Sequence, residues 1–173
     1  MDYESIDIDE IEEGKLWFGS FSPGNIKFLK EKGIKKILTV MDGAPSNYSY
    51  KEHGFIHKII DIMDFDSENI IQHFGECLNF IKGEEKVFVH CAAGESRSAT
   101  IVIAYLMWKK KWTFDKAYNF VKSKRSRIYP NFGFRDQLQL FEKLLLENFF
   151  DISKIYFKSI KWPEHKTAYF SFH

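Results

Sequence analysis

The residues best able to do chemistry together lie in one segment, Val87 to Thr100, which reads VFVHCAAGESRSAT. Cys91 follows a run of β-branched and aromatic residues typical of a strand, and Arg97 lies six positions later, where an apolar helix pattern begins. A tight loop between a strand end and a helix N-terminus turns successive backbone N–H groups toward one centre, which binds anions. Gly94 permits the positive φ or close approach that such a loop requires. The segment therefore predicts an anion-binding loop with a cysteine at its base.

Cys91 and Arg97 supply this loop with groups that can carry out a reaction. The field that holds an anion also favours the nucleophilic thiolate, and a planar guanidinium can grip two phosphate oxygens. These parts supply the positioning and charge neutralisation that phosphoryl transfer needs. No Gly-Lys-[Ser/Thr] sequence follows Gly94, which excludes an ATP-type phosphate loop. The alternatives are a buried core cysteine beside a surface arginine, or a rhodanese or arsenate reductase; the context of His90 and Ser98 fits them poorly.

The spacing His90-Cys91-x-x-Gly94-x-x-Arg97-Ser98 matches the HCxxGxxR[ST] signature of Cys-dependent protein tyrosine phosphatases. The later Tyr129-Pro-Asn-Phe-Gly-Phe segment resembles the dual-specificity branch, close to MAP kinase phosphatases and their small atypical relatives. The resemblance covers residues 9–147. It implies a three-layer, phosphotyrosine-phosphatase-like α/β fold. It also implies hydrolysis of phosphotyrosine and phosphoserine or phosphothreonine on proteins through a phosphocysteine intermediate.

The resemblance assigns roles within the loop. Cys91 would be the nucleophile, Ser98 would hydrogen-bond its sulfur and ease its departure, and His90 would prop the loop and favour the thiolate. The phosphate-binding backbone would come from Ala92, Ala93, Gly94, Glu95, Ser96 and Arg97. Glu95 departs from the family pattern, because relatives hold an apolar or basic residue there. We expect its carboxylate to repel a dianionic substrate.

A general acid is also implied, on the loop before the helix that precedes the signature strand. Asp61, Asp64 and Asp66 all qualify, and the helical phase of residues 69–74 favours Asp64. Its task would be to protonate the leaving oxygen and then activate water. The alternative is that these carboxylates cap a helix or solvate a loop.

Other residues carry weaker signals. Arg125 matches the position where some relatives grip a second phosphate, although a basic helix end is usually a solvated face. Asn131 resembles a structural asparagine at the start of the final helix. Cys77 falls on the inner stripe of its helix, which favours core packing over a role as resolving partner for oxidised Cys91.

Strands alternating with helices, followed by helices alone, predict a central, mostly parallel sheet with helices on both faces. The expected strands are 16–18, 34–40, 55–62 and 86–90. The expected helices run from a Ser22-Pro23 start to Gly33, over 70–81 with Ser67 or Asp66 as cap, over 98–108, from Thr113 to Lys124, and onward from Asn131.

Composition limits the class of protein. With 25 basic and 24 acidic residues the net charge is +1, which excludes a polyanion-coating protein and gives no sign of a nucleic-acid partner. With 173 residues, of which 45% are apolar, the chain can build one core that needs no metal or disulfide. Two cysteines, an acidic start and no long apolar run predict a cytoplasmic protein, with the nucleus as a second candidate, and no membrane partner. No metal or cofactor is expected.

The chain is expected to divide into an acidic arm (1–8), a catalytic domain (9–148) and an aromatic-rich extension (149–173). Alternation around 155–157 and 168–172 predicts two short strands joined by a turn at 163–166. The extension would pack on the domain, giving a monomer, or on a second copy, giving a homodimer. The expected partner is a phosphoprotein, with a MAP kinase as one candidate. The alternatives are an enzyme acting on an RNA 5′ end, a phosphoinositide or a glucan, and a phospho-binding pseudophosphatase.

Overall fold

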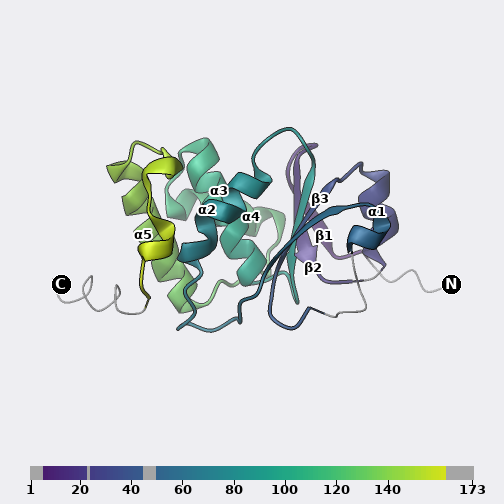
Figure 1. Cartoon of the computed structure of the whole chain (residues 1–173), viewed down its shortest axis with the longest axis horizontal. Helices are drawn as coiled ribbons and strands as arrows, with labels where there is room; N and C mark the ends of the chain where they lie inside the picture. Colours follow the sequence, from purple (N-terminus) through teal and green to yellow (C-terminus); the bar gives the residue numbers. More distant parts are fainter. Residues whose placement is uncertain (1–5, 23, 45–49, 163–173) are drawn as a thin grey trace.

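The computed structural model describes residues 6–22, 24–44 and 50–162. Its five strands form one sheet in the order β1-β2-β5-β3-β4 (Figure 1). The strands are β1 (Ile8–Glu12), β2 (Leu16–Ser20), β3 (Lys36–Val40), β4 (Ile56–Ile60) and β5 (Val87–Cys91). Neighbours from β2 to β4 pair in parallel, and β1 alone runs antiparallel, against β2. The predicted, mostly parallel sheet is confirmed.

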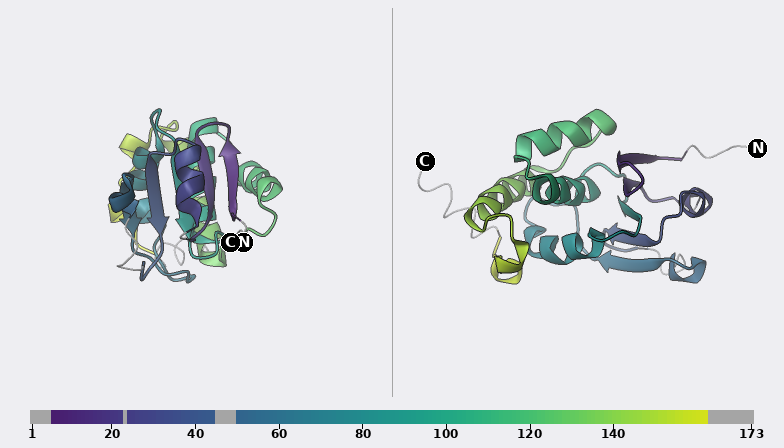
Figure 2. Two further views of the ribbon diagram at one scale, coloured as in Figure 1. Left: turned by 90° about the vertical axis from the view of Figure 1, so that its right-hand side faces the viewer. Right: turned by 90° about the horizontal axis from the view of Figure 1, so that it is seen from above.

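Helices cover both faces of the sheet, as the sequence predicted. They are α1 (Asn25–Glu31), α2 (Phe74–Ile81), α3 (Arg97–Lys110), α4 (Phe114–Lys124) and α5 (Phe132–Glu147). Figures 1 and 2 show α1 on one side of the sheet and the other four helices on the opposite side, which makes three layers. Within the described ranges, no helix has both the length and the apolar character needed to cross a membrane.

The central strand β5 separates two apolar cores. Its side chains alternate, so Val87 and Val89 join the large core beneath α2–α5, whereas Phe88 joins a smaller core beneath α1. All five β5 residues are buried. The helix α3 that follows is buried continuously from Arg97 to Met107. The strand and the helix that flank the signature loop are therefore the most enclosed elements of the fold.

The predicted boundary between the N-terminal arm and the catalytic domain is wrong. Strand β1 begins at Ile8, inside the predicted arm of residues 1–8, and Ile8 pairs with Gly19 of β2. Because acidic residues are dense here, the sequence pattern did not indicate this edge strand, which is half-buried and in which Ile11 alone is buried. Two of those acids, Asp7 and Asp9, are ion-paired to Arg125. The acids from Asp7 onward are thus part of the domain.

Two predicted helix starts were wrong, and two were confirmed. Helix α1 begins at Asn25, after Gly24 rather than after a Ser22 cap. Helix α2 begins at Phe74 behind a 3₁₀ turn, without a side-chain cap, because the backbone N–H of Ile71 is satisfied by Gln137 Oε1 of α5 at 3.0 Å. The contact with Gln137, together with a 3.4 Å hydrogen bond from the Gln72 N–H to Asn69 Oδ1, serves the turn where a Ser67 or Asp66 cap was predicted. In contrast, Thr113 and Asn131 cap α4 and α5 as predicted.

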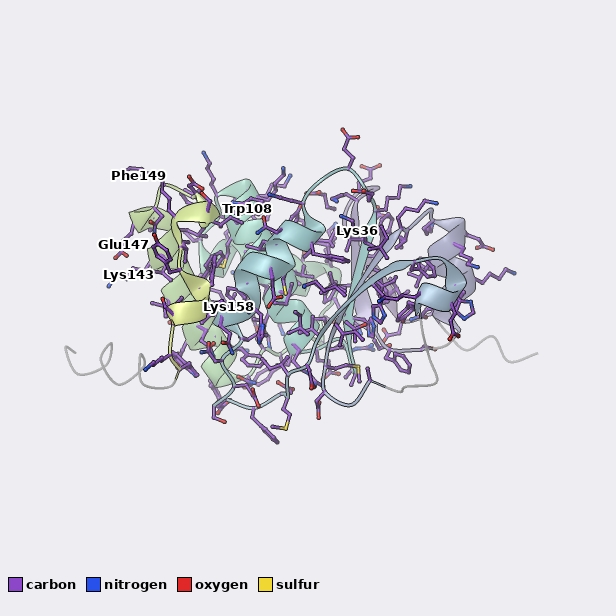
Figure 3. All side chains as sticks on the ribbon, in the orientation of Figure 1. Lys36, Trp108, Lys143, Glu147, Phe149 and Lys158 are labelled. Carbon is purple, nitrogen blue, oxygen red and sulfur yellow. The ribbon has the colours of Figure 1, made fainter. Side chains whose placement is uncertain are left out.

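The described part of the C-terminal extension, residues 149–162, packs on its own domain through two 3₁₀ turns. The strand predicted around 155–157 is wrong, because the chain there forms 3₁₀ turns at Ile152–Lys154 and Phe157–Ser159, although Ile155 and Phe157 are buried in the large core as the alternation suggested. The Phe157 ring lies 5.9 Å from that of Phe141, and Lys158 pairs with Glu76 of α2 at 2.8 Å. Figure 3 shows Lys158 among the helices, far from Lys36 of β3. The second predicted strand and its turn lie outside the described residues.

Replacing Phe157 with alanine should destabilise the protein by about 3 kcal/mol, because a buried aromatic ring would leave a cavity in the core. The adjacent Tyr156 is 83% exposed and supplies the matched control. Tyr156→Ala should change the free energy of unfolding, measured in urea, by less than about 0.5 kcal/mol. Equal costs for the two variants would mean that this segment does not pack on the domain.

Candidate active site

The loop between β5 and α3 is held by its carbonyl groups. Each carbonyl from Cys91 to Ser96 accepts a hydrogen bond from a surrounding group. The donors, in order, are His90 Nδ1 (3.1 Å), Phe21 N (3.1 Å), Arg125 Nη2 (3.1 Å), Arg125 Nε (2.8 Å), Tyr129 N (2.7 Å) and Thr100 N (2.9 Å). A peptide plane points its C=O and the following N–H in opposite directions. The N–H groups of residues 92–97 therefore face the opposite side of the loop, as an anion cradle requires.

The loop fits tightly against β2. Gly94 has φ = +68°, and a Cβ at this position would lie 2.5 Å from the backbone carbon of Gly19. Only glycine satisfies both the left-handed backbone and the close approach. The sequence prediction for Gly94 is met by this geometry.

Cys91 sits at the base of the loop as the last residue of β5, and it is buried. Its Sγ lies 3.1 Å from the hydroxyl oxygen of Ser98, in the first turn of α3. A hydroxyl at this distance can donate a hydrogen bond to a thiolate and stabilise it as a leaving group. The predicted pairing of Cys91 with Ser98 is thus present.

His90 supports the loop without contributing a positive charge. It is fully buried, and burial lowers its pKa to about 4, so the ring is neutral at pH 7. Because its Nδ1–H donates to the Cys91 carbonyl, its Nε2 accepts from the Thr39 hydroxyl at 2.7 Å. The Thr39 oxygen in turn accepts from His57 Nε2 at 2.7 Å. The expectation that His90 props the loop agrees with this hydrogen-bonded chain, and its effect on the Cys91 thiolate stays a prediction.

Hydrogen bonds from one end of its guanidinium hold Arg97 in place. Its Nη1 donates to Asp42 Oδ1 at 2.7 Å and to the carbonyl of Ile62 at 3.0 Å. Its Nε is buried and has no hydrogen-bond partner among the described residues. A buried donor without a partner costs free energy unless a ligand satisfies it. Arg97 is therefore suited to hold an anion at the loop.

The Asp64 carboxylate is hydrogen-bonded to the anion-binding loop. Its Oδ1 accepts from the Ser96 hydroxyl at 2.6 Å and from Asn131 Nδ2 at 2.9 Å. Asp66 also reaches the pocket, but its carboxylate faces the backbone N–H of Gly133 at 3.4 Å. Asp61 does not line the pocket. Of the three candidate acids, Asp64 is the one that is hydrogen-bonded to the anion loop.

These groups surround one cavity of about 300 Å³. Its lining consists of Asp64, Asp66, Cys91, Ala92, Ala93, Glu95, Ser96, Arg97, Tyr129, Asn131 and Phe132. Tyr129 and Phe132 are 53% and 62% exposed, so the mouth is aromatic. Glu95 stands at the rim, with its carboxylate 3.9 Å from Arg127. The signature residues and the acid loop are thus brought together at the carboxyl ends of the parallel strands.

Arg125 lies behind the loop rather than in the pocket. It is 4% exposed, and its guanidinium is bonded to the carbonyls of Ala93 and Gly94 and to the carboxylates of Asp7 and Asp9. The hydrogen bond from Arg125 lowers the pKa of Asp7 to about 2. The geometry contradicts the expected contact with a second phosphate, because the Arg125 guanidinium is already hydrogen-bonded to the loop carbonyls and to the two carboxylates.

Sequence reasoning missed the supporting residues Asp42, Thr39, His57, Asp7 and Asp9. Asp42 follows the carboxyl end of β3, and parallel strands bring such ends to one edge, which was a usable signal. The others are identified only by tertiary contacts.

Cys77 is fully buried, and burial raises the pKa of its thiol. A scarce thiolate fits core packing rather than a resolving role.

A cysteine at the base of an anion loop, paired with a hydroxyl, an arginine and a nearby acid, defines a Cys-dependent phosphatase site. Residues 16–144 match the family model described as dual specificity phosphatase, catalytic domain. The chain belongs to the dual specificity phosphatase family. It is thus a phosphoric monoester hydrolase of the protein tyrosine, serine and threonine phosphatase class.

Named relatives agree with the family assignment. Dual specificity protein phosphatase 1B of Arabidopsis thaliana is 41% identical over 147 residues, which are 82% of this chain and 86% of that protein. The MAP kinase phosphatase with leucine-rich repeats protein 1 of Dictyostelium discoideum is 46% identical over 69% of this chain, but the match spans only 14% of that protein. The crystal structure of human tyrosine phosphatase-like serine/threonine/tyrosine-interacting protein is 34% identical, with a TM-score of 0.75, covering 81% of this chain and 98% of that one.

The support role of Arg125 predicts the behaviour of Arg125→Met. Without Arg125, the carbonyls of Ala93 and Gly94 lose their donors, which raises the free energy of the loop conformation by on the order of 1–3 kcal/mol for each carbonyl. Because the anion cradle depends on that conformation, kcat/KM should fall at least about tenfold. The loss should be equal for singly and doubly phosphorylated peptides. Lys124→Met removes an adjacent, exposed cation and should change little. A loss confined to doubly phosphorylated peptides would restore the second-phosphate role.

Proposed function

We propose that this enzyme hydrolyses phosphoproteins through a phosphocysteine formed on Cys91. The Cys91 thiolate attacks phosphorus while the ester P–O bond breaks, and Asp64 gives its proton to the leaving oxygen. The loop amides and Arg97 neutralise the equatorial oxygens. Asp64 then takes a proton from water as that water attacks phosphorus. The P–S bond breaks, and Ser98 stabilises the departing thiolate.

One observation carries this proposal. A thiol, an unpartnered buried arginine N–H and a carboxylate tethered to the loop share one cavity. Asp64 is held there by Ser96 and Asn131, so the acid and the nucleophile approach the substrate from a fixed arrangement. Pre-positioning of this kind is a large part of what an enzyme can supply to phosphoryl transfer.

Cys91→Ser should abolish turnover while vanadate binding, measured by calorimetry, persists, because the amides and Arg97 remain. Asp64→Asn should lower kcat about 10²–10³-fold for phenyl phosphate, whose leaving group needs a proton. It should have little effect on 2,4-dinitrophenyl phosphate, whose leaving group does not.

Asp66→Asn is the matched control and should leave both rates nearly unchanged. If Asp66→Asn rather than Asp64→Asn shows the dependence on leaving group, the acid has been assigned to the wrong carboxylate. Cys91→Ser with turnover like that of the wild type would contradict the phosphocysteine.

We further propose that the substrate presents apolar or basic residues beside its phosphorylated side chain. Tyr129 and Phe132 are exposed at the mouth, and the Glu95 and Asp66 carboxylates line the same cavity, with Arg127 offsetting part of the Glu95 charge from 3.9 Å. A MAP kinase is supported as one candidate by the name of the Dictyostelium relative. The acidic rim is expected to weaken binding wherever acidic residues flank the phosphate.

Glu95→Lys should therefore raise kcat/KM toward acidic phosphopeptides, and the gain should shrink as salt is added. At 0.15 M salt, charges are screened over about 8 Å, so a rim carboxylate acts on a nearby dianion. Glu147→Lys makes the same change of charge at the far end of α5 (Figure 3) and serves as the control. Equal kinetics for the wild type and Glu95→Lys across the salt range would refute the role of the rim charge.

A reducing compartment, such as the cytoplasm or the nucleus, is part of the proposal. Both cysteines, Cys77 and Cys91, are free thiols, and the chemistry needs Cys91 reduced.

A further inference from the structure

The C-terminal segment, residues 149–162, lies outside the matched family domain yet returns to the active-site side of the molecule. After α5 ends at Glu147, its first part is anchored in the core by Ile155 and Phe157. Lys158 then pairs with Glu76 of α2. These contacts fix the path of the chain, so the residues that follow are delivered to a defined place.

That place is the acid loop, residues 61–70 between β4 and the 3₁₀ turn before α2. Asn69 Nδ2 donates to the carbonyl of Ile160 at 2.7 Å, and Trp162 Nε1 donates to the carbonyl of Asp66 at 3.0 Å. Both hydrogen bonds join the segment to the loop that carries Asp64. Each bond joins a side-chain donor to a backbone carbonyl, so the main chain is held at Ile160 of the segment and at Asp66 of the loop.

The opposite side of Asp66 is held by α5. A Cβ at Gly133 would lie 2.0 Å from the Asp66 carbonyl oxygen, so the first turn of α5 sits directly against this peptide. The Asp66 carbonyl thus lies between Gly133 and the Trp162 indole. Asn131, two residues before Gly133, hydrogen-bonds the Asp64 carboxylate itself. The acid loop is clamped from both sides, two residues from the proposed acid.

We propose that the C-terminal segment positions the general acid, with Trp162 as a positioning residue that acts through Asp66. The proposal rests on the acid role proposed for Asp64. A loop held on one side only can move away from the leaving group, and a misplacement of about 1 Å can cost up to about 100-fold in rate. Trp162 touches no reacting atom, so its effect appears only in the step that needs the acid.

The test compares the wild type with Trp162→Phe, which keeps an aromatic ring and removes the N–H donor. For phenyl phosphate, kcat should fall about tenfold through poorer acid placement. For 2,4-dinitrophenyl phosphate, kcat should stay at the wild-type value, as should KM for both substrates. Tyr156→Phe removes a polar group from the same segment at an 83% exposed position and should match the wild type throughout.

A double-mutant cycle completes the test, because residues that act through one group are not additive. In the Asp64→Asn background, Trp162→Phe should cause no further loss. Equal slowing of both substrates, an unchanged rate on phenyl phosphate, or a full additional loss in the Asp64→Asn background would each overturn the positioning role. If Asp64→Asn itself shows no dependence on the leaving group, the proposed acid role fails; if only Trp162→Phe is silent, the positioning role alone fails.

Discussion

The outward anchoring of the carbonyls from Cys91 to Ser96 is the constraint on which the site depends. Buried carbonyls need partners, and each partner found here comes from a neighbouring part of the fold: β5 itself, the β2–α1 connection, the end of α4, the segment before α5 and the first turn of α3. Because the peptides are planar, satisfying these carbonyls also directs the N–H groups toward the ligand side. The anion site is therefore a consequence of how the rest of the chain satisfies its backbone.

Two sets of polar contacts hold this arrangement from behind. Arg125 carries a buried positive charge that is tolerated because Asp7 and Asp9 compensate it. The chain His57–Thr39–His90 ends on the Cys91 carbonyl, and its rings are kept neutral because burial lowers the pKa of both histidines. One set is ionic and the other neutral, so they should respond differently to salt and to pH. The edge strand β1 is thereby joined to the chemistry although it lies outside the pocket.

Much of this was readable in the sequence, because local chemistry determined it. The spacing from Cys91 to Arg97 and the flanking apolar runs define a strand, a loop and a helix, and the caps Thr113 and Asn131 act within their own turns. Three of the wrong predictions have one cause, which is tertiary contact. The uncapped start of α2 depends on Gln137, the buried position of Arg125 depends on acids over 100 residues away, and the C-terminal turns depend on a core groove for Phe157.

The most direct measurement is a crystal structure of the protein with orthovanadate. The account predicts vanadate bonded to Cys91 Sγ, with N–H groups of residues 92–97 and Arg97 Nε donating to its oxygens, and Asp64 beside the apical oxygen. The loop carbonyls should keep the partners described above. Vanadate bound elsewhere, or a loop whose carbonyls turn inward toward it, would contradict the account.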